Sequence, residues 1–487
     1  MPDPGVPTYL NAHHPGGFAD NVEAELEDVA PSEEEAEQPP PASHVLQGHD
    51  EIVWAVEVSP TSGRVYTASA DGSVRCWDAH SRRCIVVLEG HTRPVLALAL
   101  SDRHLFSGSY DNTIRVWCIR SLRRVAVLNG HDDAVRALQV MPSCRTLFSA
   151  SYDRTLRAWC LDTLQQFSGP SGDALKGHTG PVRALAALGG RLFSASYDKT
   201  VRCWDASHLL CLGTMEGHRE AVRALSALPQ HGLLASGSDD WTVRLWNAET
   251  MACVAVCEGH SDNVRVLATC GDTLFSGSWD HTVRAWALGT SAAPGTCVAV
   301  MSGHREAVLA LAVCRGHVVS GSFDTSVRFW STTAHGFPCV AKSDGHEDAV
   351  RVLSSSGPEA ETCYSGSYDG CIGFLRVPPL LCPSVLPPPS TSSSSMVVLQ
   401  QQPSRALARQ GGPSQELAGG GSGSAGPSPQ RASSPGDRAP EAAAAPRSAP
   451  PQLDAEAEEL ADLLRTSALV SANALQSSRS ATDATEI

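Results

Sequence analysis

A histidine, a serine or threonine, an aspartate and usually a tryptophan recur together along this chain, and residues of these types can do chemistry. In a hydrolase, His131, Ser149 and Asp153 would be the general base, the nucleophile and the acid that orients the base. An enzyme needs one such set, whereas this chain carries eight. Each set begins with a Gly-His pair, and the histidines are His49, His91, His131, His178, His218, His260, His304 and His346. Eight copies need a shared structural reason, so we interpret the set as part of the architecture.

Other signatures of catalysis or cofactor binding are missing from the sequence. The chain contains no Gly-x-Ser-x-Gly and no Cys-x-x-Cys motif. A Gly-Lys phosphate loop is also absent, because none of the three lysines follows a glycine. The pair His13-His14 has no cysteine or further histidine nearby that would complete a metal site. We therefore predict that the protein is not an enzyme and holds no cofactor or metal.

The elements that carry the repeated residues are predicted to be β-hairpins. In residues 105–117, apolar residues lead into Ser-Gly-Ser, a turn follows at residues 110–112, and polar and apolar residues then alternate. Close copies of this hairpin end at Trp77, Trp159, Trp204, Trp246, Trp286 and Trp330. An eighth copy keeps Asp369 but has Gly373 and Leu375 where the others have Arg and Trp.

The repeats have a nearly fixed length. Successive glycines of the Gly-His pairs are separated by 42, 40, 47, 40, 42, 44 and 42 residues. A period of this size predicts a repeat architecture in which no unit buries its apolar faces alone. One strand precedes the first Gly-His pair and the last three strands have none after them, so we expect these two parts to complete each other and close a ring.

These Gly-His to Trp units resemble WD40 repeats, and residues 43–377 resemble one all-β WD40 β-propeller. The resemblance implies eight blades, with seven as the alternative because the eighth copy is degenerate. Only Trp77-Asp78 and Trp204-Asp205 keep the second residue of the pair that names the family.

In WD40 proteins the corresponding residues form a hydrogen-bonded network inside each blade. Either serine of the hairpin, such as Ser107 or Ser109, could complete it. The resemblance assigns this structural role to His91, Asp111, Trp117, His131, Asp153, Trp159, His178, Asp198, Trp204, His218, Asp240, Trp246, His260, Asp280, Trp286, His304, Asp324 and Trp330.

Two positions that vary within the repeat are the predicted partner-binding residues. Immediately before the turn aspartate stands an aromatic residue in six units: Tyr110, Tyr152, Tyr197, Trp279, Phe323 and Tyr368. Five residues after the histidine stand Arg136, Arg183, Arg223, Arg265 and Arg351, with Trp54 in the first unit. In WD40 proteins both positions lie on the top face. Arginine beside tyrosine or tryptophan is typical of binding hot spots, and guanidinium groups suit carboxylate or phosphate. The alternative is that these arginines pair with turn acids such as Asp132 and Asp133.

The sequence outside the repeats divides into four segments. Residues 1–42 contain ten acids and no base, and their composition predicts an acidic disordered tail. Residues 378–452 are predicted to be a disordered linker rich in Pro, Ser, Gly and Ala. Residues 453–475 carry leucines at helical spacing behind a cluster of acids, which predicts an amphipathic helix that docks on a partner or on the propeller. Residues 476–487 are predicted to be disordered.

Composition bears on compartment and partners. The chain carries 16 cysteines, mostly inside strand patterns, and no signal sequence opens it, so we predict a cytoplasmic or nuclear protein without disulfides. Its apolar runs are too short to span a bilayer.

We predict a protein-interaction scaffold whose propeller binds acidic or phosphorylated segments. Alternatives are a ubiquitin-ligase substrate receptor that works through a separate adaptor and, less favoured, an enzyme or a nucleic-acid binder. The acidic tail is also predicted to contact the arginines within the same chain.

Overall fold

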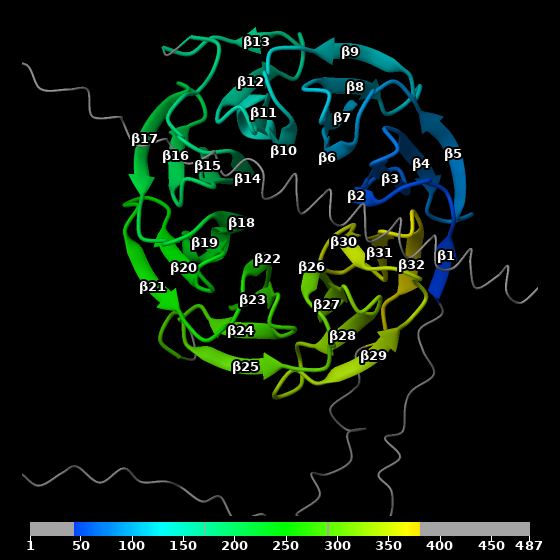
Figure 1. The fold of residues 1–487 in the computed structure, drawn as a ribbon, viewed down its shortest axis with the longest axis vertical. Helices are drawn as coiled ribbons and strands as arrows, with labels where there is room; N and C mark the ends of the chain where they lie inside the picture. The colour runs from blue at the N-terminus through cyan, green and yellow to red at the C-terminus, as the bar shows by residue number, and fades with distance from the viewer. Residues whose placement is uncertain (1–42, 171, 290–291, 380–487) are drawn as a thin grey trace, which may run out of the picture. The chain divides into compact units, whose positions relative to one another are not determined.

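The computed structural model describes residues 43–379, except residues 171, 290 and 291, and these residues form eight four-stranded antiparallel sheets. The sheets are arranged as the blades of a ring around a central axis (Figure 1). The prediction of an all-β propeller with eight blades is confirmed, and the seven-bladed alternative is wrong. Residues 1–42 and 380–487, which include the predicted amphipathic segment 453–475, lie outside the described residues.

Seven blades follow one another along the chain, each built from four consecutive strands. Blades 1 to 4 contain β2 (Val53–Val58), β3 (Arg64–Ser69), β4 (Val74–Asp78) and β5 (Arg83–Leu88); β6 (Val95–Leu100), β7 (His104–Ser109), β8 (Ile114–Cys118) and β9 (Arg124–Leu128); β10 (Val135–Met141), β11 (Thr146–Ser151), β12 (Leu156–Cys160) and β13 (Gln166–Phe167); β14 (Val182–Leu188), β15 (Arg191–Ser196), β16 (Val201–Asp205) and β17 (Leu210–Met215). Blades 5 to 7 contain β18 (Val222–Leu228), β19 (Leu233–Ser238), β20 (Val243–Asn247) and β21 (Cys253–Cys257); β22 (Val264–Cys270), β23 (Thr273–Ser278), β24 (Val283–Ala287) and β25 (Cys297–Met301); β26 (Val308–Cys314), β27 (His317–Ser322), β28 (Val327–Ser331) and β29 (Cys339–Ser343). Two short 3₁₀ helices, η1 (Pro142–Cys144) and η2 (Pro229–His231), join first and second strands in blades 3 and 5.

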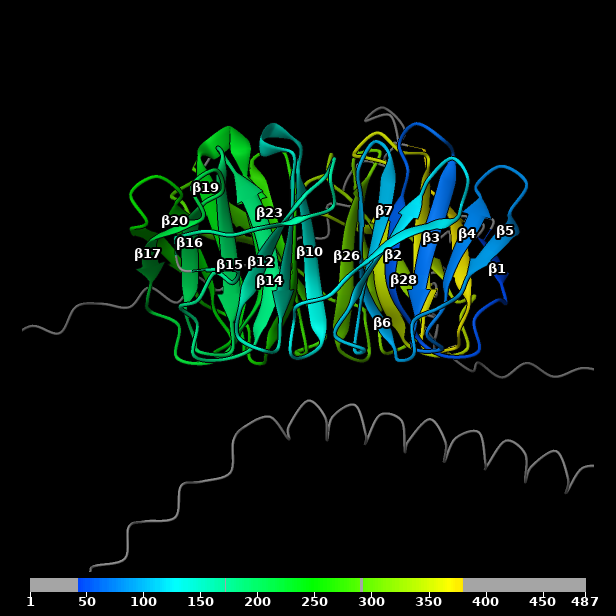
Figure 2. The same cartoon turned by 90° about the horizontal axis from the view of Figure 1, so that it is seen from above.

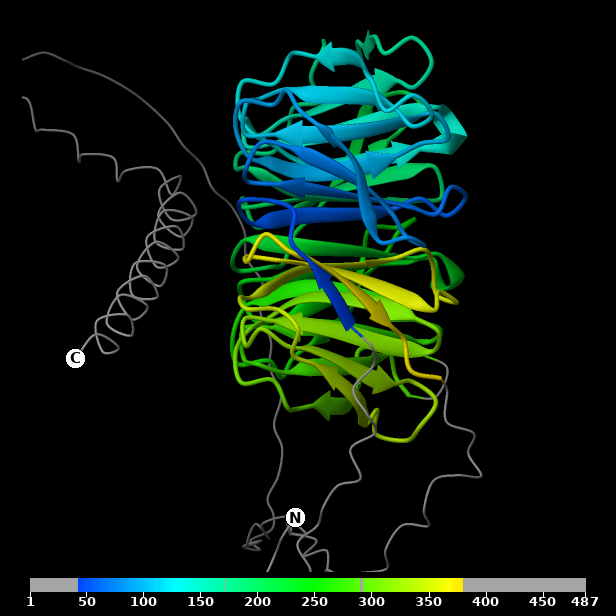
Figure 3. The same cartoon turned by 90° about the vertical axis from the view of Figure 1, so that its right-hand side faces the viewer.

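Blade 8 joins the two ends of the propeller. It consists of β30 (Val350–Ser355), β31 (Thr362–Ser367), β32 (Ile372–Arg376) and, as its outer strand, β1 (Ser43–Leu46). In the antiparallel pairing of β1 with β32, Ser43 lies opposite Leu375 and Leu46 opposite Ile372. Figure 3 shows the blue first strand alongside the yellow last strand. Because this pairing satisfies the edges of both strands, it closes the ring.

The strands run between two faces of the ring (Figure 2). We call the face that carries the turns between second and third strands the upper face, and the opposite one the lower face. The upper turns form because a serine and an aspartate hold the backbone: Ser109 Oγ accepts the Asp111 N–H at 3.0 Å, and Asp111 Oδ1 accepts the Thr113 N–H at 3.0 Å. Between them, Asn112 has a φ of 66°, in the left-handed region that asparagine tolerates.

The apolar core lies between neighbouring blades. Trp204 of blade 4, for example, is buried against Phe148 and Leu156 of blade 3. Every sheet is therefore covered on both faces, as the period of the repeat requires.

The fifteen cysteines of residues 43–379 are all free thiols. No helix in this part of the chain has the length and apolarity needed to cross a bilayer.

Candidate functional site

The repeated polar residues form one hydrogen-bonded network inside each blade. The histidine Nδ1 lies 2.6–3.0 Å from the turn aspartate in all eight described blades. Its Nε2 lies 2.7–2.8 Å from a serine or threonine hydroxyl of the second strand. In blades 1 to 7 the tryptophan Nε1–H donates to the same hydroxyl at 2.8–3.0 Å. The network thus ties the Gly-His loop to the hairpin.

A neutral imidazole satisfies every group in this network. In blade 3 the Asp153 carboxylate can only accept, so His131 carries its proton on Nδ1 and accepts from Ser149 at Nε2. The Ser149 oxygen in turn accepts the Trp159 N–H. This hydrogen-bonding order is the one found in a hydrolase triad, but Ser149 is fully buried and its oxygen also accepts the indole N–H, so the hydroxyl is held inside the blade.

The structure also separates the two serines of each hairpin. Ser107 joins the network, accepting the Trp117 N–H at 2.9 Å, whereas Ser109 donates to the carbonyl of Arg93 at 3.1 Å and holds the turn. The sequence left this choice open, because both serines point to the same side of the strand.

Hydrogen bonding sets the charge of the turn aspartates. Burial alone would raise the pKa of Asp153, but hydrogen bonds from His131 and Thr155 outweigh burial and lower this pKa to about 2. The pKa of Asp369 falls to about 2 by the same balance with His346. The pKa is lowered for the same reason at Asp71, Asp111, Asp198, Asp240, Asp280 and Asp324. These aspartates are therefore ionised at neutral pH and accept several donors each.

A second arginine series, four residues after the turn aspartate, packs against the Gly-His glycines. A Cβ built on Gly130 would lie 2.9 Å from Arg157 Nη1, and one on Gly303 would lie 2.9 Å from Arg328 Nη1. These glycines have φ values of 155° and 152°. The backbone conformation and the neighbouring guanidinium group both explain why glycine precedes the histidine.

Blade 8 departs from this pattern. Leu375 replaces the tryptophan, so Ser365 lacks an indole donor, although it still contacts His346 Nε2 at 2.7 Å. Gly373 lies directly opposite Ser365 in the register, and a Cβ there would collide with the Ser365 hydroxyl. Glycine and leucine therefore fit this blade where arginine and tryptophan fit the others.

The predicted partner-binding residues of the inner strands are the bulge residues of those strands. In blade 3 the register passes from Val135 directly to Ala137, which leaves Arg136 out of the pairing. The same irregularity occurs at the corresponding position of every described blade. A bulge re-aims the side chain of its extra residue. It places these residues at the upper end of the innermost strands: Trp54, Leu96, Arg136, Arg183, Arg223, Arg265, Leu309 and Arg351.

The predicted aromatic residues lie beside these bulges. The Tyr152 N–H donates to the carbonyl of Ala134 at 3.0 Å, one residue before the bulged strand, and the Tyr368 N–H donates to Ala349 at 2.9 Å. We call the eight bulge residues and the eight residues before the turn aspartates the crown. The crown residues predicted to bind partners are all half-buried. The aromatic ones are Tyr110, Tyr152, Tyr197, Trp279, Phe323 and Tyr368, while Ala70 and Asp239 occupy the two other blades.

Arginines and aromatic rings of the crown contact each other. The Arg265 guanidinium lies 4.3 Å from the Trp279 ring centre, and that of Arg351 lies 5.1 Å from the Trp54 ring centre. Tyr110 and Tyr152 of adjacent blades meet edge to face at 6.2 Å.

Arg223 is the crown arginine with an acidic partner in its own blade. Its Nε donates to Asp239 Oδ2 at 2.7 Å, and the guanidinium lies 4.4 Å from the Tyr197 ring centre, with a hydrogen bond to the Tyr197 hydroxyl. Asp239 thus takes the place of the aromatic residue in blade 5 and holds Arg223 in position. Asp132 and Asp133 are the turn acids predicted as alternative partners. The Asp132 backbone N–H donates to Asp153 Oδ2, and the Asp133 carboxylate accepts the Ala134 N–H at Oδ1.

The crown concentrates positive charge near the axis. Burial lowers the pKa of Arg351 to about 10, and repulsion from Arg136, Arg183 and Arg265 adds to the effect, while Tyr368 opposes it. These three arginines belong to blades 3, 4 and 6, so their charges act on Arg351 across the ring. An anion on the upper face would meet several guanidinium groups at once.

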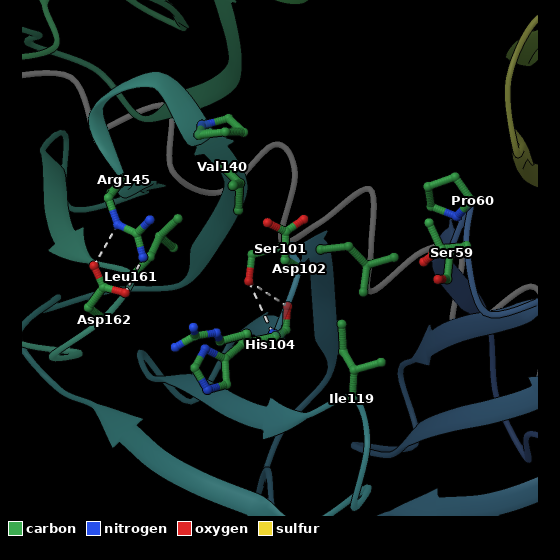
Figure 4. Close-up of a pocket in the computed structure, with 14 residues that line it drawn as sticks. Ser59, Pro60, Ser101, Asp102, His104, Ile119, Val140, Arg145, Leu161 and Asp162 are labelled. Atoms are coloured by element: carbon green, nitrogen blue, oxygen red, sulfur yellow. Dashed lines mark hydrogen bonds and ion pairs between the residues drawn. The ribbon is translucent and has the colours of Figure 1, made fainter.

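The lower face carries a different feature, a cavity of about 260 Å³ between blades 1 to 3 (Figure 4). Its polar groups are largely occupied with each other. Arg145 forms two hydrogen bonds with Asp162, one of them 2.6 Å from Nε to Oδ2, and Ser101 accepts the His104 N–H at 3.1 Å. This cavity lacks the cluster of arginines and rings that the upper face has. The described residues contain no group of His, Cys, Asp and Glu that could hold a metal ion.

The fold and the repeated network define a β-propeller of the Gly-His to Trp type. The family model described as "WD domain, G-beta repeat" matches this chain seven times, at residues 41–78, 82–118, 122–160, 169–205, 209–247, 251–287 and 295–331. These matches cover more than half of the chain, and the protein therefore belongs to the WD40 repeat family. Strands β30 to β32 of blade 8 lie beyond the last match, whereas its outer strand β1 lies within the first.

Similar proteins share parts of this fold. The chain is 56% identical over 39 residues to "Striatin-4" of Homo sapiens, which is 8% of this chain and 5% of that protein. It is 38% identical over 60 residues to "Mitochondrial division protein 1" of Chaetomium globosum, which is 12% of this chain and 9% of that protein. The chain thus spans less than a tenth of the length of these relatives. The crystal structure of the computationally designed Ika8 protein matches with a TM-score of 0.61 and 28% identity, over 68% of this chain and 98% of that protein.

Proposed function

We propose that this protein is a scaffold whose crown binds acidic or phosphorylated segments of other proteins. A WD40 propeller is in general a non-catalytic platform for protein interactions, and each network here uses its hydroxyl and imidazole internally. The observation that carries the proposal is the crown itself: five arginines raised on bulges, in one ring, beside aromatic side chains. Such residues bind carboxylate and phosphate groups and form interaction hot spots.

The acidic segment 1–42 is proposed to compete with partners for the crown. It carries ten acids and no base. β1 begins at the lower face, because Ser43 pairs with Leu375 near the end of β32, so the described chain starts on the side of the ring opposite the crown. A random coil of about 40 residues has a root-mean-square span of roughly 35 Å.

We further propose a cytoplasmic or nuclear location, on the basis of the free thiols.

Fluorescence polarisation with labelled 12-residue peptides tests the binding function. The set contains glutamate-rich peptides, phosphoserine peptides and neutral peptides of the same length, titrated with the full chain and with a chain that lacks residues 1–42. Glutamate-rich or phosphoserine peptides should bind, and the combined substitution Arg136→Gln, Arg183→Gln and Arg265→Gln should weaken them at least about tenfold. Deletion of residues 1–42 should tighten them at low salt.

The matched control carries the same number of substitutions at exposed arginines of the lower face, namely Arg82→Gln, Arg120→Gln and Arg123→Gln. This variant should bind as the unmodified chain does. Equal binding by the crown variant and the control would remove the crown as the binding site. An unchanged affinity after the deletion would remove the proposed competition.

A further inference from the structure

The crown is divided into two halves along the ring. Four consecutive inner strands, β10, β14, β18 and β22, carry arginine at the bulge: Arg136, Arg183, Arg223 and Arg265. The other four inner strands, β26, β30, β2 and β6, carry Leu309, Arg351, Trp54 and Leu96. In Figure 1 the first group forms the cyan-to-green side of the ring, and the second group runs from yellow-green through yellow to blue.

The two halves are complementary across the axis. In a ring of eight blades, blades that are four places apart lie opposite each other. Arg136 is therefore opposite Leu309, and Arg265 is opposite Leu96. Arg223 is opposite Trp54 by the same count. Only Arg183 faces another arginine, Arg351.

The aromatic rings of the two halves also differ in the groups that they contact. In the arginine half, Tyr197 and Trp279 each have a guanidinium group within 4.4 Å of the ring centre. In the other half the rings contact one another, with Phe323 5.7 Å from Tyr368 and Tyr368 6.4 Å from Trp54, and the one guanidinium group there, that of Arg351, lies farther away, at 5.1 Å from the Trp54 ring centre. These three rings follow one another across blades 7, 8 and 1, with Leu309 at the bulge of blade 7 and Arg351 at the bulge of blade 8.

We propose that the crown recognises a bipartite segment, in which a cluster of carboxylates or a phosphate is separated by a few residues from a large apolar side chain. The arginine half binds the anionic part, and the surface formed by Phe323, Tyr368, Trp54 and Leu309 binds the apolar part. This inference rests on the proposed function and adds a second requirement to it. Acidic residues alone fill one half of the crown and leave the other half solvated.

Peptides that separate the two requirements test this inference. The probes are fluorescein-labelled peptides with four glutamates in a Gly-Ser background, in which one tryptophan is placed one to six residues before or after the glutamates. One reference peptide replaces the tryptophan with serine, and a second replaces the glutamates with glutamine. We expect the best bipartite peptide to bind the full chain about tenfold or more tightly than the glutamate-only peptide, as burial of one large apolar side chain predicts.

A matched pair of substitutions assigns the effect to the apolar half. Phe323 and Tyr152 occupy the same position before the turn aspartate, one in each half, and both are half-buried. Phe323→Ala should lower the affinity for the bipartite peptide about tenfold and leave the glutamate-only peptide unchanged. Tyr152→Ala should preserve the preference for tryptophan. Circular dichroism verifies that both variants are folded.

The outcomes distinguish this inference from the function on which it rests. If the glutamate-only peptide binds and no tryptophan position improves it, the bipartite requirement is wrong and the acidic-segment function stands. If neither the glutamate-containing peptides nor the phosphoserine peptides bind, the proposed function itself is wrong. A tryptophan gain that Phe323→Ala leaves intact would also overturn the assignment to the apolar half.

Discussion

The network inside the blades and the crown on the upper face come from the same repeat, but the network residues are constant from blade to blade and the crown residues vary. The network keeps its histidine, hydroxyl and aspartate in all eight described blades, at distances that vary by less than half an ångström. The crown changes its residue from blade to blade between arginine, leucine and tryptophan at the bulge. Invariance follows from a demand that every blade shares, namely that its buried polar groups be paired. Variation places different chemistry around one ring.

The two regions also contribute differently to stability. The turn aspartates have lowered pKa values, so their ionised form favours the folded state. Arg351 has its pKa lowered to about 10 by burial and by three arginines across the ring, so its charged form opposes folding. The network therefore stabilises the propeller, whereas the crown holds charges that a bound anion would compensate.

Acid should break the network in all blades together and cause the largest effect. The pKa of Asp153 is 3.8 in the unfolded chain and about 2 in the folded one, so the unfolded chain binds more protons between these values. Stability is fully present above about pH 4 and is lost as the pH falls toward 2, with Asp153 alone contributing about 2 kcal/mol. Urea unfolding from pH 7 to pH 2.5 measures this loss. Asp153→Asn should be less stable at pH 7 and should show a shallower decline; a stability that is flat down to pH 2.5 would contradict the mechanism.

Removal of one network should lower the stability of the fold less than acid does, but more than any crown substitution does. His131→Ala leaves Ser149 and Asp153 without their shared partner, and we expect a loss of about 2–4 kcal/mol in the free energy of unfolding. The control is His208→Ala, because the His208 side chain is 74% exposed and also bonds to an aspartate. Urea denaturation should show little change in the control. Equal losses in the two variants would mean that burial of the network is irrelevant.

A crown substitution should have the smallest effect on stability, with the opposite sign. Arg351→Gln removes a charge that the fold disfavours below pH 10, and we expect unfolding to become about 1 kcal/mol less favourable. Affinity for acidic peptides should fall at the same time. Thermal unfolding and peptide titration of this variant measure both quantities. A destabilisation as large as that of His131→Ala would contradict this prediction, because it would mean that the Arg351 side chain stabilises the fold.

The sequence predicts the blades because their signals are local. The alternation in residues 105–117 and the period of the Gly-His pairs both follow from what a buried sheet repeat demands, and the early strand at residues 43–46 anticipates ring closure. The bulge at Arg136 is different. Nothing in the sequence around it shows that this residue drops out of register, because the pairing depends on the neighbouring strand.

Two further features of the site depend on the three-dimensional arrangement. The choice between Ser107 and Ser109 depends on the position of His91 across the blade, which spacing along one strand does not define. The division of the crown becomes visible only when blades four places apart are seen to face each other, since Arg136 and Leu309 are far apart in the chain. Residues 453–475 lie outside the described part of the chain, so the amphipathic helix stays a prediction.

The closure of the ring has a mechanical consequence. β1 and β32 are held by four residue pairs, and Ser43 and Leu375 form the pair at the end where both strands meet the flanking segments. A force that draws those two segments apart acts on this terminal pair first and then on each following pair in turn. Antiparallel strands loaded from the same end unzip one pair at a time, whereas strands loaded from opposite ends must shear all their hydrogen bonds together. Tension between the two ends of the propeller should therefore open blade 8 one residue pair at a time.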